Sequence, residues 1–280
     1  MRWRGRRKSD NVVDQRGKRM VSKRGASGGA MILLVLAGLF FGEDVQKVLS
    51  LFVGNSGQQT SVTQNSNSSN QNDETANFVK VILAETEDTW DAVFSQMGQR
   101  YRRPKLVMYE GQVNSACGVG SAASGPFYCP ADYQIYIDLS FLKQLKQMGA
   151  PGDFAFAYVI AHEVGHHVQN ITGIASKVRQ QQAQGSKVQS NALSVRLELQ
   201  ADCLAGIWIN HTEKRNAILE AGDIEEGLRA AAAVGDDRLM QQAGRAPRRE
   251  AFTHGSSKER MEWFQRGMRS GNIQSCNTFS

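Results

Sequence analysis

The segment that most constrains the fold is an apolar run that leads into a pair of histidines four residues apart. Residues 154–170 read FAFAYVIAHEVGHHVQN. Asp153 precedes the run and can cap a helix, so the segment predicts a helix toward residue 170. His162 and His166 are four residues apart, and one helical face therefore carries both imidazoles. Because the apolar run is buried in a folded domain, the two histidines need polar partners at the edge of a core.

The spacing His162-Glu163-x-x-His166 is typical of a zinc site. Two imidazoles on one helical face can reach a single cation, and Glu163 lies beside them, placed to take a proton from water. The alternative is a surface helix that carries two histidines by chance. The apolar run before His162 weighs against that alternative, since it predicts burial.

Catalytic zinc takes three protein ligands and keeps one position for water. One known class supplies the third ligand from an extended motif, with glycine at position 169 and histidine at position 172. This chain has Gln169 and Thr172 there, which excludes that class. Glu198 and Asp202 lie four residues apart in the helical stretch NALSVRLELQADCLAGIWIN. We expect Glu198 to bind zinc and Asp202 to accept a hydrogen bond from a zinc-bound histidine; a solvated acidic face is the alternative.

The positive charge of the chain lies almost entirely at its beginning. Residues 1–24 hold ten basic and two acidic residues, so the rest carries 23 basic and 25 acidic groups. The rest is close to neutral and predicts no nucleic-acid partner. Residues 25–42 follow without a charge, which predicts a membrane anchor, with a cleaved signal peptide and a buried core helix as alternatives. The positive-inside rule then puts residues 1–24 in the cytoplasm and the domain outside it, on a single-pass inner-membrane protein.

Residues 43–76 predict a flexible polar linker, because Ser, Asn, Gln and Thr dominate them. The folded domain is then expected over 77–280, as a mostly helical α+β domain with a small sheet. Apolar spacing, caps and alternation predict helices over 78–97, 141–148, 153–170, 189–211, 224–234 and 256–268, with strands over 105–109 and 134–138.

Four cysteines fit a compartment outside the cytoplasm, where disulfides form. Three pairings are possible from the sequence. The short loop between Cys117 and Cys129 favours that bridge, which leaves Cys203 and Cys276 for the second. Four free thiols are the alternative.

The chain resembles the bacterial neutral zinc metallopeptidase family (YpfJ-like proteins). The segments GPFYCPADYQIYIDLSF, AHEVGHHVQN, RLELQADCLAGIW and FTHGSSKERMEWFQRG carry the resemblance, together with the basic N-terminus and the apolar run. The two acidic residues after the histidine motif are similar to the gluzincin class of metallopeptidases. The resemblance implies a zincin fold, with residues 134–138 as an edge strand near the cleft that binds extended peptide by strand addition.

Gluzincins often use a downstream histidine to stabilise the oxyanion of the reaction. The resemblance therefore implies that role for His254, which lies on a loop before the last predicted helix. An exposed loop histidine is the alternative, with Arg260 or Tyr133 as the donor instead. His211 and His254 are the histidines that would replace Glu198 as third zinc ligand.

The expected function is a membrane-anchored zinc metallopeptidase that holds one Zn²⁺ per chain and cleaves a peptide or protein. Zinc would activate water, with Glu163 as general base. Two alternatives stay open. One is a zinc hydrolase of a non-peptide amide, and the other is a non-catalytic, membrane-tethered module in which zinc is structural.

Overall fold

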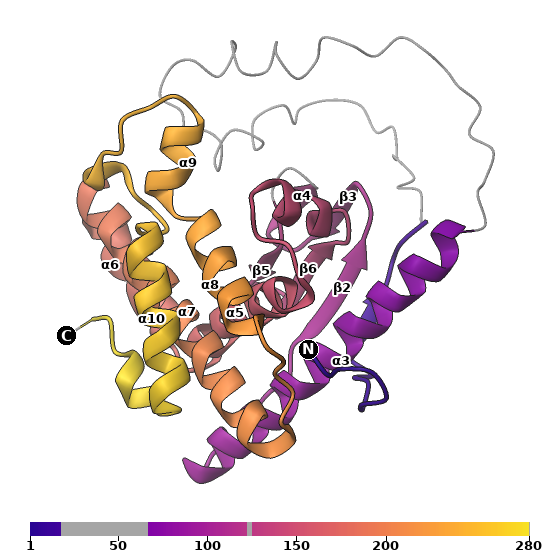
Figure 1. Cartoon of the computed structure of the whole chain (residues 1–280). Helices are drawn as coiled ribbons and strands as arrows, with labels where there is room; N and C mark the ends of the chain where they lie inside the picture. The colour runs from indigo at the N-terminus through magenta and orange to yellow at the C-terminus, as the bar shows by residue number, and fades with distance from the viewer. Residues whose placement is uncertain (18–66, 122–124, 280) are drawn as a thin grey trace, which may run out of the picture. The chain divides into compact units, whose positions relative to one another are not determined.

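Helices dominate the computed structural model, which describes residues 1–17, 67–121 and 125–279. Figure 1 shows a small sheet lying among them. The α-helices are α3 (Asn67–Gln96), α4 (Phe141–Gln147), α5 (Asp153–Ile171), α6 (Ile174–Gln184), α7 (Lys187–Asn216), α8 (Asp223–Ala233), α9 (Asp236–Gln242) and α10 (Ser257–Ser270), with 3-10 turns η2 (Arg249–Ala251) and η3 (Ile273–Cys276). The strands are β1 (Val12–Asp14), β2 (Lys105–Tyr109), β3 (Gln112–Ser115), β4 (Gly118–Ser121), β5 (Phe127–Cys129) and β6 (Gln134–Asp138).

The main sheet has the strand order β1-β2-β6-β5. β1, β2 and β6 run parallel, whereas β5 pairs antiparallel with β6. Side chains alternate between the two faces of a strand. Leu106 and Met108 of β2 therefore join the main core, while Val107 and Tyr109 join a smaller cluster on the other face. The antiparallel pair β3–β4 contributes Val113 to that smaller cluster.

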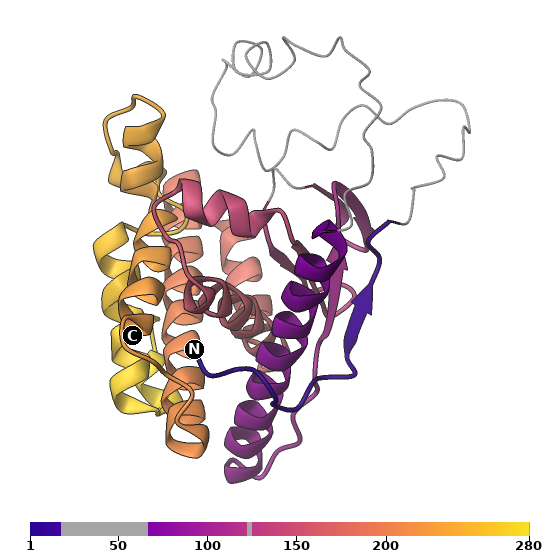
Figure 2. The same cartoon turned by 45° about the vertical axis from the view of Figure 1, so that its right-hand side comes forward.

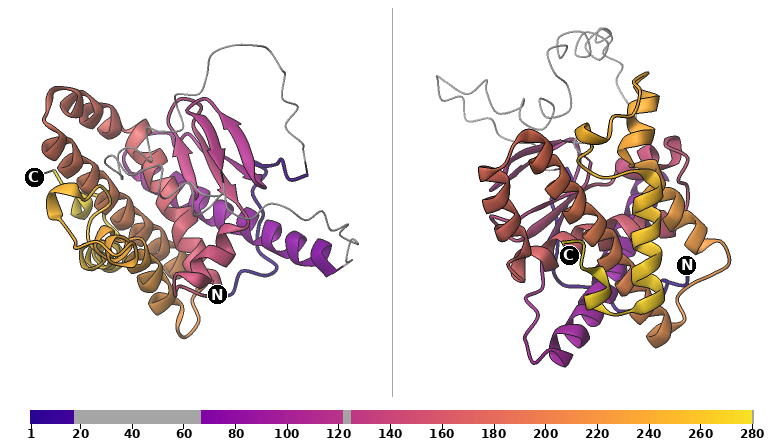
Figure 3. Two further views of the ribbon diagram at one scale, coloured as in Figure 1. Left: turned by 90° about the horizontal axis from the view of Figure 1, so that it is seen from above. Right: turned by 90° about the vertical axis from the view of Figure 1, so that its left-hand side faces the viewer.

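Helix α5 lies between the sheet and α7 (Figure 3). Its apolar run fills the main core, and Phe154, Phe156 and Tyr158 are among the largest fully buried side chains. This explains why a stretch with few polar residues forms a helix in the interior: it is covered on both sides. Its second half carries the histidine motif, at residues 162–166.

Helices α7 and α10 approach each other closely through two glycines. A Cβ atom at Gly267 would lie 1.9 Å from the carbonyl oxygen of Cys203, and one at Gly206 would lie 2.2 Å from that of Phe264. Only glycine therefore permits this spacing. The close approach brings α10 against the part of α7 that carries Asp202.

The predicted mostly helical α+β architecture with a small sheet is what the structure shows. Strands 105–109 and 134–138 have the predicted bounds, and the six predicted helices are present with ends shifted by up to eleven residues. The predicted place of residues 134–138 at the edge of the sheet is wrong. β6 lies inside the sheet, and β5 occupies the edge beyond it, because residues 127–129 pair with β6.

Residues 1–17 do not form a separate basic tail. Strand β1 pairs with β2 along the sheet (Figure 2), and residues 1–18 form one compact unit with residues 73–280. Arg7 pairs with Glu87 and Asp88 of α3, at 3.1 and 2.7 Å. Part of the basic charge at the start of the chain therefore forms ion pairs with acidic side chains of α3.

The structure does not support the membrane-spanning helix that was predicted before the domain. Across the described ranges, every helix is too short or too polar to cross a bilayer. The expected span over 25–42 lies outside the described residues.

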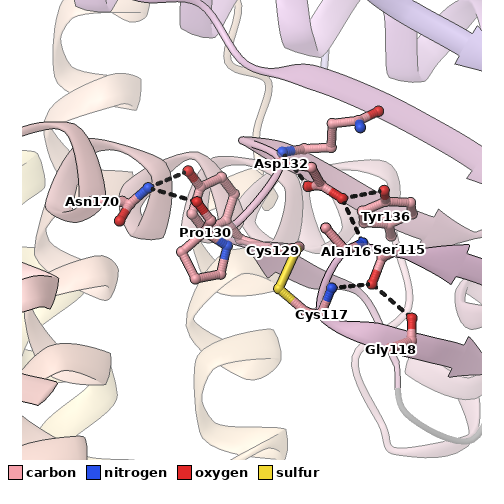
Figure 4. Close-up of a disulfide and its surroundings, with 11 residues drawn as sticks. Ser115, Ala116, Cys117, Gly118, Cys129, Pro130, Asp132, Tyr136 and Asn170 are labelled. Carbon is pink, nitrogen blue, oxygen red and sulfur yellow. Dashed lines mark hydrogen bonds between the residues drawn. A yellow bond between two sulfur atoms is a disulfide. The ribbon is translucent and has the colours of Figure 1, made fainter.

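Both expected disulfides are present, Cys117–Cys129 and Cys203–Cys276. The first joins the β3–β4 turn to the end of β5 (Figure 4). Asp132 supports the same turn, because its carboxylate accepts hydrogen bonds from the Ala116 amide at 2.9 Å and from Tyr136 Oη at 2.8 Å. The second disulfide ties the C-terminal segment to α7.

Candidate metal centre

Three side chains from two helices converge on one point. His162 and His166 come from α5, and Glu198 comes from the neighbouring turns of α7. One ligand atom from each lies within 4.8 Å of the other two. The Nε2 atom of His162 is 3.2 Å from one oxygen of Glu198, and that of His166 is 3.4 Å from the other. Sequence spacing alone had grouped these three residues.

The separations between these atoms fit a zinc ion. Ligand atoms about 2.0–2.1 Å from a tetrahedral zinc lie roughly 3.4 Å from one another, close to the two distances between Glu198 and the histidines. The donor set of two imidazoles and one carboxylate is also one that catalytic zinc uses. His166 and Glu198 keep about a fifth of their side-chain surface exposed, at 21% and 18%, so solvent can reach a fourth position.

The two histidines point their other ring nitrogen at acceptors. Nδ1 of His162 lies 2.8 Å from the Asp202 carboxylate, and Nδ1 of His166 lies 2.9 Å from the side-chain oxygen of Gln169. An acceptor opposite Nδ1 requires a proton there, so the lone pair of the neutral ring is on Nε2. Both lone pairs then face Glu198. This is the arrangement that metal-binding histidines adopt.

Without a metal the same centre attracts protons. Burial lowers the pKa of His162, but the charge of Asp202 and hydrogen bonds to Asp202 and Glu198 raise it, to about 9. Although burial opposes it, the charge of His166 and hydrogen bonds from both histidines hold the pKa of Glu198 well below its ordinary value. The centre therefore favours positive charge, which a divalent metal supplies in exchange for protons.

Glu163 lies next to this centre and belongs to none of these bonds. It is 7% exposed. Burial raises the pKa of its carboxyl, against the opposing charges of His166 and His162. A buried carboxylate with a raised pKa beside a metal centre has the properties of a general base.

Asp202 is held by a fully buried network. Tyr158 Oη donates to one carboxylate oxygen of Asp202. Arg260 in α10 donates to both oxygens, from Nε and Nη2, at 2.9 Å each. Asp202 and Arg260 are almost completely enclosed, at 0% and 2% exposure. Arg260 is therefore committed to Asp202, which argues against its expected alternative role as an oxyanion donor.

His254 lies on the loop before α10. Its Nδ1 is 3.3 Å from Asp236, whose other carboxylate oxygen accepts from the backbone amides of Thr253, His254 and Gly255. The charge of His254 is among those that lower the pKa of Glu198, so the two side chains are within electrostatic reach. His211 instead hydrogen-bonds the carbonyl of Gly271 through Nε2, at 2.8 Å, outside the group.

Sequence reasoning named Asp202 but missed two other residues that support the centre, Gln169 and Tyr158. Gln169 was noted only as a departure from another zinc motif, and Tyr158 was counted as part of an apolar run. Tyr158 lies four residues before His162, and this spacing on one helical face could have identified it. His167 is the third histidine of the segment and lies on another face, where its ring nitrogens contact Tyr128 Oη and the carbonyl of Arg102.

Comparison with known proteins agrees with this geometry. No solved structure matches the chain. "Uncharacterized protein YpfJ" of Escherichia coli (strain K12) is 49% identical over 290 residues, which cover 100% of this chain and 99% of that protein. "Uncharacterized protein Rv2575" of Mycobacterium tuberculosis (strain H37Rv) is 42% identical over 214 residues, or 72% of this chain and 71% of that protein. A family model described as "Putative neutral zinc metallopeptidase" matches residues 1–279. The chain that carries this two-helix centre therefore belongs to that zinc metallopeptidase family.

Proposed function

We propose that the protein is a zinc-dependent metallopeptidase that holds one zinc ion through His162, His166 and Glu198. The observation that carries the proposal is the convergence of both Nε2 atoms on the Glu198 carboxylate, with each Nδ1 bonded to an acceptor. Family membership supports zinc and peptide hydrolysis. The buried Glu163 beside the centre supports catalysis in particular.

The residues of the chain divide the chemistry among them. A zinc ion bound here would polarise the scissile carbonyl. It would also lower the pKa of water, so that water could lose a proton and attack near neutral pH. Glu163 accepts the proton of the attacking water and passes it to the departing amine. Asp202 and Gln169 hold the two imidazoles in the orientation that keeps Nε2 toward the centre.

Two other functions would use the same residues. A structural zinc site is normally closed by four protein ligands, whereas the group found among the described residues has three. A buried Glu163 also has no role in a structural site. Hydrolysis of a non-peptide amide uses the same machinery, so only substrates distinguish it from peptide cleavage.

The full chain should therefore be incubated with a mixed peptide library, with and without a chelator, and the products sequenced. We expect cleavage that a chelator abolishes and that added zinc restores. Zinc binding without peptide cleavage, together with hydrolysis of a simple amide, would favour a hydrolase of non-peptide amides. Zinc that binds in a four-ligand site without any hydrolysis would favour a structural zinc site.

Replacing Asp202 with alanine should weaken zinc binding by about 10–100-fold, because the acceptor that orients His162 is lost. The measurement is competition for zinc with a coloured chelator. Since alanine also leaves Arg260 buried without its partner, Asp202→Asn serves as the matched variant and thermal unfolding is followed in both. Wild-type zinc affinity in both variants would remove Asp202 from the centre.

Replacing His254 with alanine should lower peptide turnover by about 10²–10³-fold, the usual cost of removing an oxyanion donor. Zinc content should not change, because His254 is not one of the three convergent ligands. We infer this role because His254 is among the charges that lower the pKa of Glu198, and because Asp236 accepts hydrogen bonds from the backbone amides of its loop. Near-normal turnover in His254→Ala would leave Tyr133 as the next donor to test.

A further inference from the structure

The two histidines of the centre are supported in different ways. His162 has a charged acceptor from another helix, Asp202, which Arg260 neutralises. His166 has a neutral acceptor from its own helix, Gln169, three residues further on. Gln169 is 1% exposed, so its amide is enclosed and its hydrogen bonds must be made within the protein.

The contacts of Gln169 decide which way its amide points. Its Nε2 lies 2.7 Å from the carbonyl oxygen of Leu197 and 3.1 Å from the side-chain oxygen of Gln200. A carbonyl can only accept, so the atom that faces Leu197 must be the NH₂ group. The oxygen of Gln169 is therefore the atom that faces His166, and it accepts the Nδ1 proton.

Gln200 is fixed in turn by the C-terminal segment. Its Nε2 donates to the carbonyl oxygen of Cys276 at 3.0 Å, and its side chain is buried, at 6% exposure. Cys276 is bonded to Cys203 of α7, one turn from Gln200. The donors thus run in one direction, from His166 through Gln169 and Gln200 to a carbonyl that a disulfide ties to the same helix.

We propose that Gln169 is a positioning residue that fixes His166 as the Nδ1-protonated ring, and that Gln200 and the Cys276 carbonyl keep Gln169 in that orientation. The proposal rests on the proposed zinc centre, since it assigns Nε2 of His166 to the metal. We call the hydrogen-bond chain from His166 through Gln169 and Gln200 to the Cys276 carbonyl the relay. Each amide of the relay has both a donor and an acceptor partner only when the donors run in this direction. Reversing the Gln169 amide would set its NH₂ against His166 and its oxygen against the carbonyl of Leu197.

The test distinguishes the loss of the hydrogen-bond acceptor from the loss of packing by the Gln169 side chain. Gln169→Met keeps the length of the side chain and removes the acceptor, so zinc affinity should fall about 10–100-fold. Gln169→Glu keeps an oxygen that accepts from Nδ1, and its carboxyl, protonated because the site is buried, keeps a donor toward the carbonyl of Leu197. Its zinc affinity should therefore fall less than that of Gln169→Met. Asn170→Ala is the control. Asn170 is the next residue, and its side chain donates to Tyr128 Oη and to the carbonyl oxygen of Pro130 (Figure 4), so this variant should bind zinc normally.

A spectroscopic measurement adds a readout that packing alone does not change. In the Co²⁺-loaded protein, the Nδ1 protons of His162 and His166 should give two shifted, exchangeable proton signals. In Gln169→Met one signal should exchange with solvent faster while the other is retained. Gln200→Met, which leaves Gln169 in place, should produce the same change to a smaller degree and serves if Gln169→Met fails to fold.

The outcomes distinguish this inference from the proposed function. Zinc binding by the wild type with equal affinity in Gln169→Met and Gln200→Met would overturn the relay and leave the metal centre standing. A wild type that binds no zinc would overturn both. Loss of zinc affinity in Gln169→Glu as severe as in Gln169→Met would show that packing, rather than the acceptor, is what Gln169 supplies.

Discussion

Replacing Glu163 with glutamine should leave zinc binding intact and reduce peptide turnover by about 10²–10⁴-fold, the usual contribution of general acid–base catalysis. Glutamine has the shape of glutamate but cannot accept the proton of the attacking water. Zinc should be retained because the convergent ligand atoms come from His162, His166 and Glu198, not from Glu163. The measurement pairs zinc content by elemental analysis with the initial rate on a cleaved library peptide.

The matched control is Glu163→Asp, which keeps a carboxylate and shortens its reach. It should retain more activity than Glu163→Gln if proton transfer is the role of this residue. Turnover in Glu163→Gln that equals wild type would remove Glu163 from the mechanism. Loss of zinc in the same variant would instead mean that the carboxylate supports the metal centre.

Local patterns predicted the parts of the fold whose signal lies within a few residues. Strand 105–109 alternates between two buried faces and 134–138 reads in the same way, so their bounds were found from the sequence. Helix α6 was missed because its sequence, IASKVRQQQAQ, is mostly polar and only Ala175 and Val178 are buried. Strand β1 was missed because its three residues follow a basic segment and gain strand structure only by pairing with β2.

The candidate site shows the same division. The zinc-binding spacing of His162 and His166 and the pair Glu198 and Asp202 could be read from helical periodicity. The roles of Arg260 and Gln200 could not, because their partners are distant in sequence. Arg260 reaches Asp202 across 58 residues, and Gln200 reaches Cys276 across 76. Such contacts depend on the packing of α7, α10 and the C-terminal segment, which no local pattern encodes.

Replacing Glu198 with alanine should abolish zinc binding, which is a larger effect than the loss expected for Asp202→Ala. Glu198 is the side chain that both histidine Nε2 atoms face, at 3.2 and 3.4 Å, and it supplies the negative charge at the ligand position. Two imidazoles without it form an incomplete set for zinc. Zinc content after dialysis against dilute chelator should therefore fall to background, and the stabilisation that zinc gives to the fold should disappear with it.

Glu198→Gln is the graded comparison, because it keeps an oxygen at the same place without the charge. It should bind zinc more weakly than wild type and more tightly than Glu198→Ala. Far-UV circular dichroism of both variants checks that α7 still forms, since Glu198 lies on a helix with a complete capping box at Ser186. Full zinc occupancy in Glu198→Ala would move the third ligand to another residue. His211 hydrogen-bonds the carbonyl of Gly271, whereas the charge of His254 reaches Glu198, so His254 would then be the residue to replace.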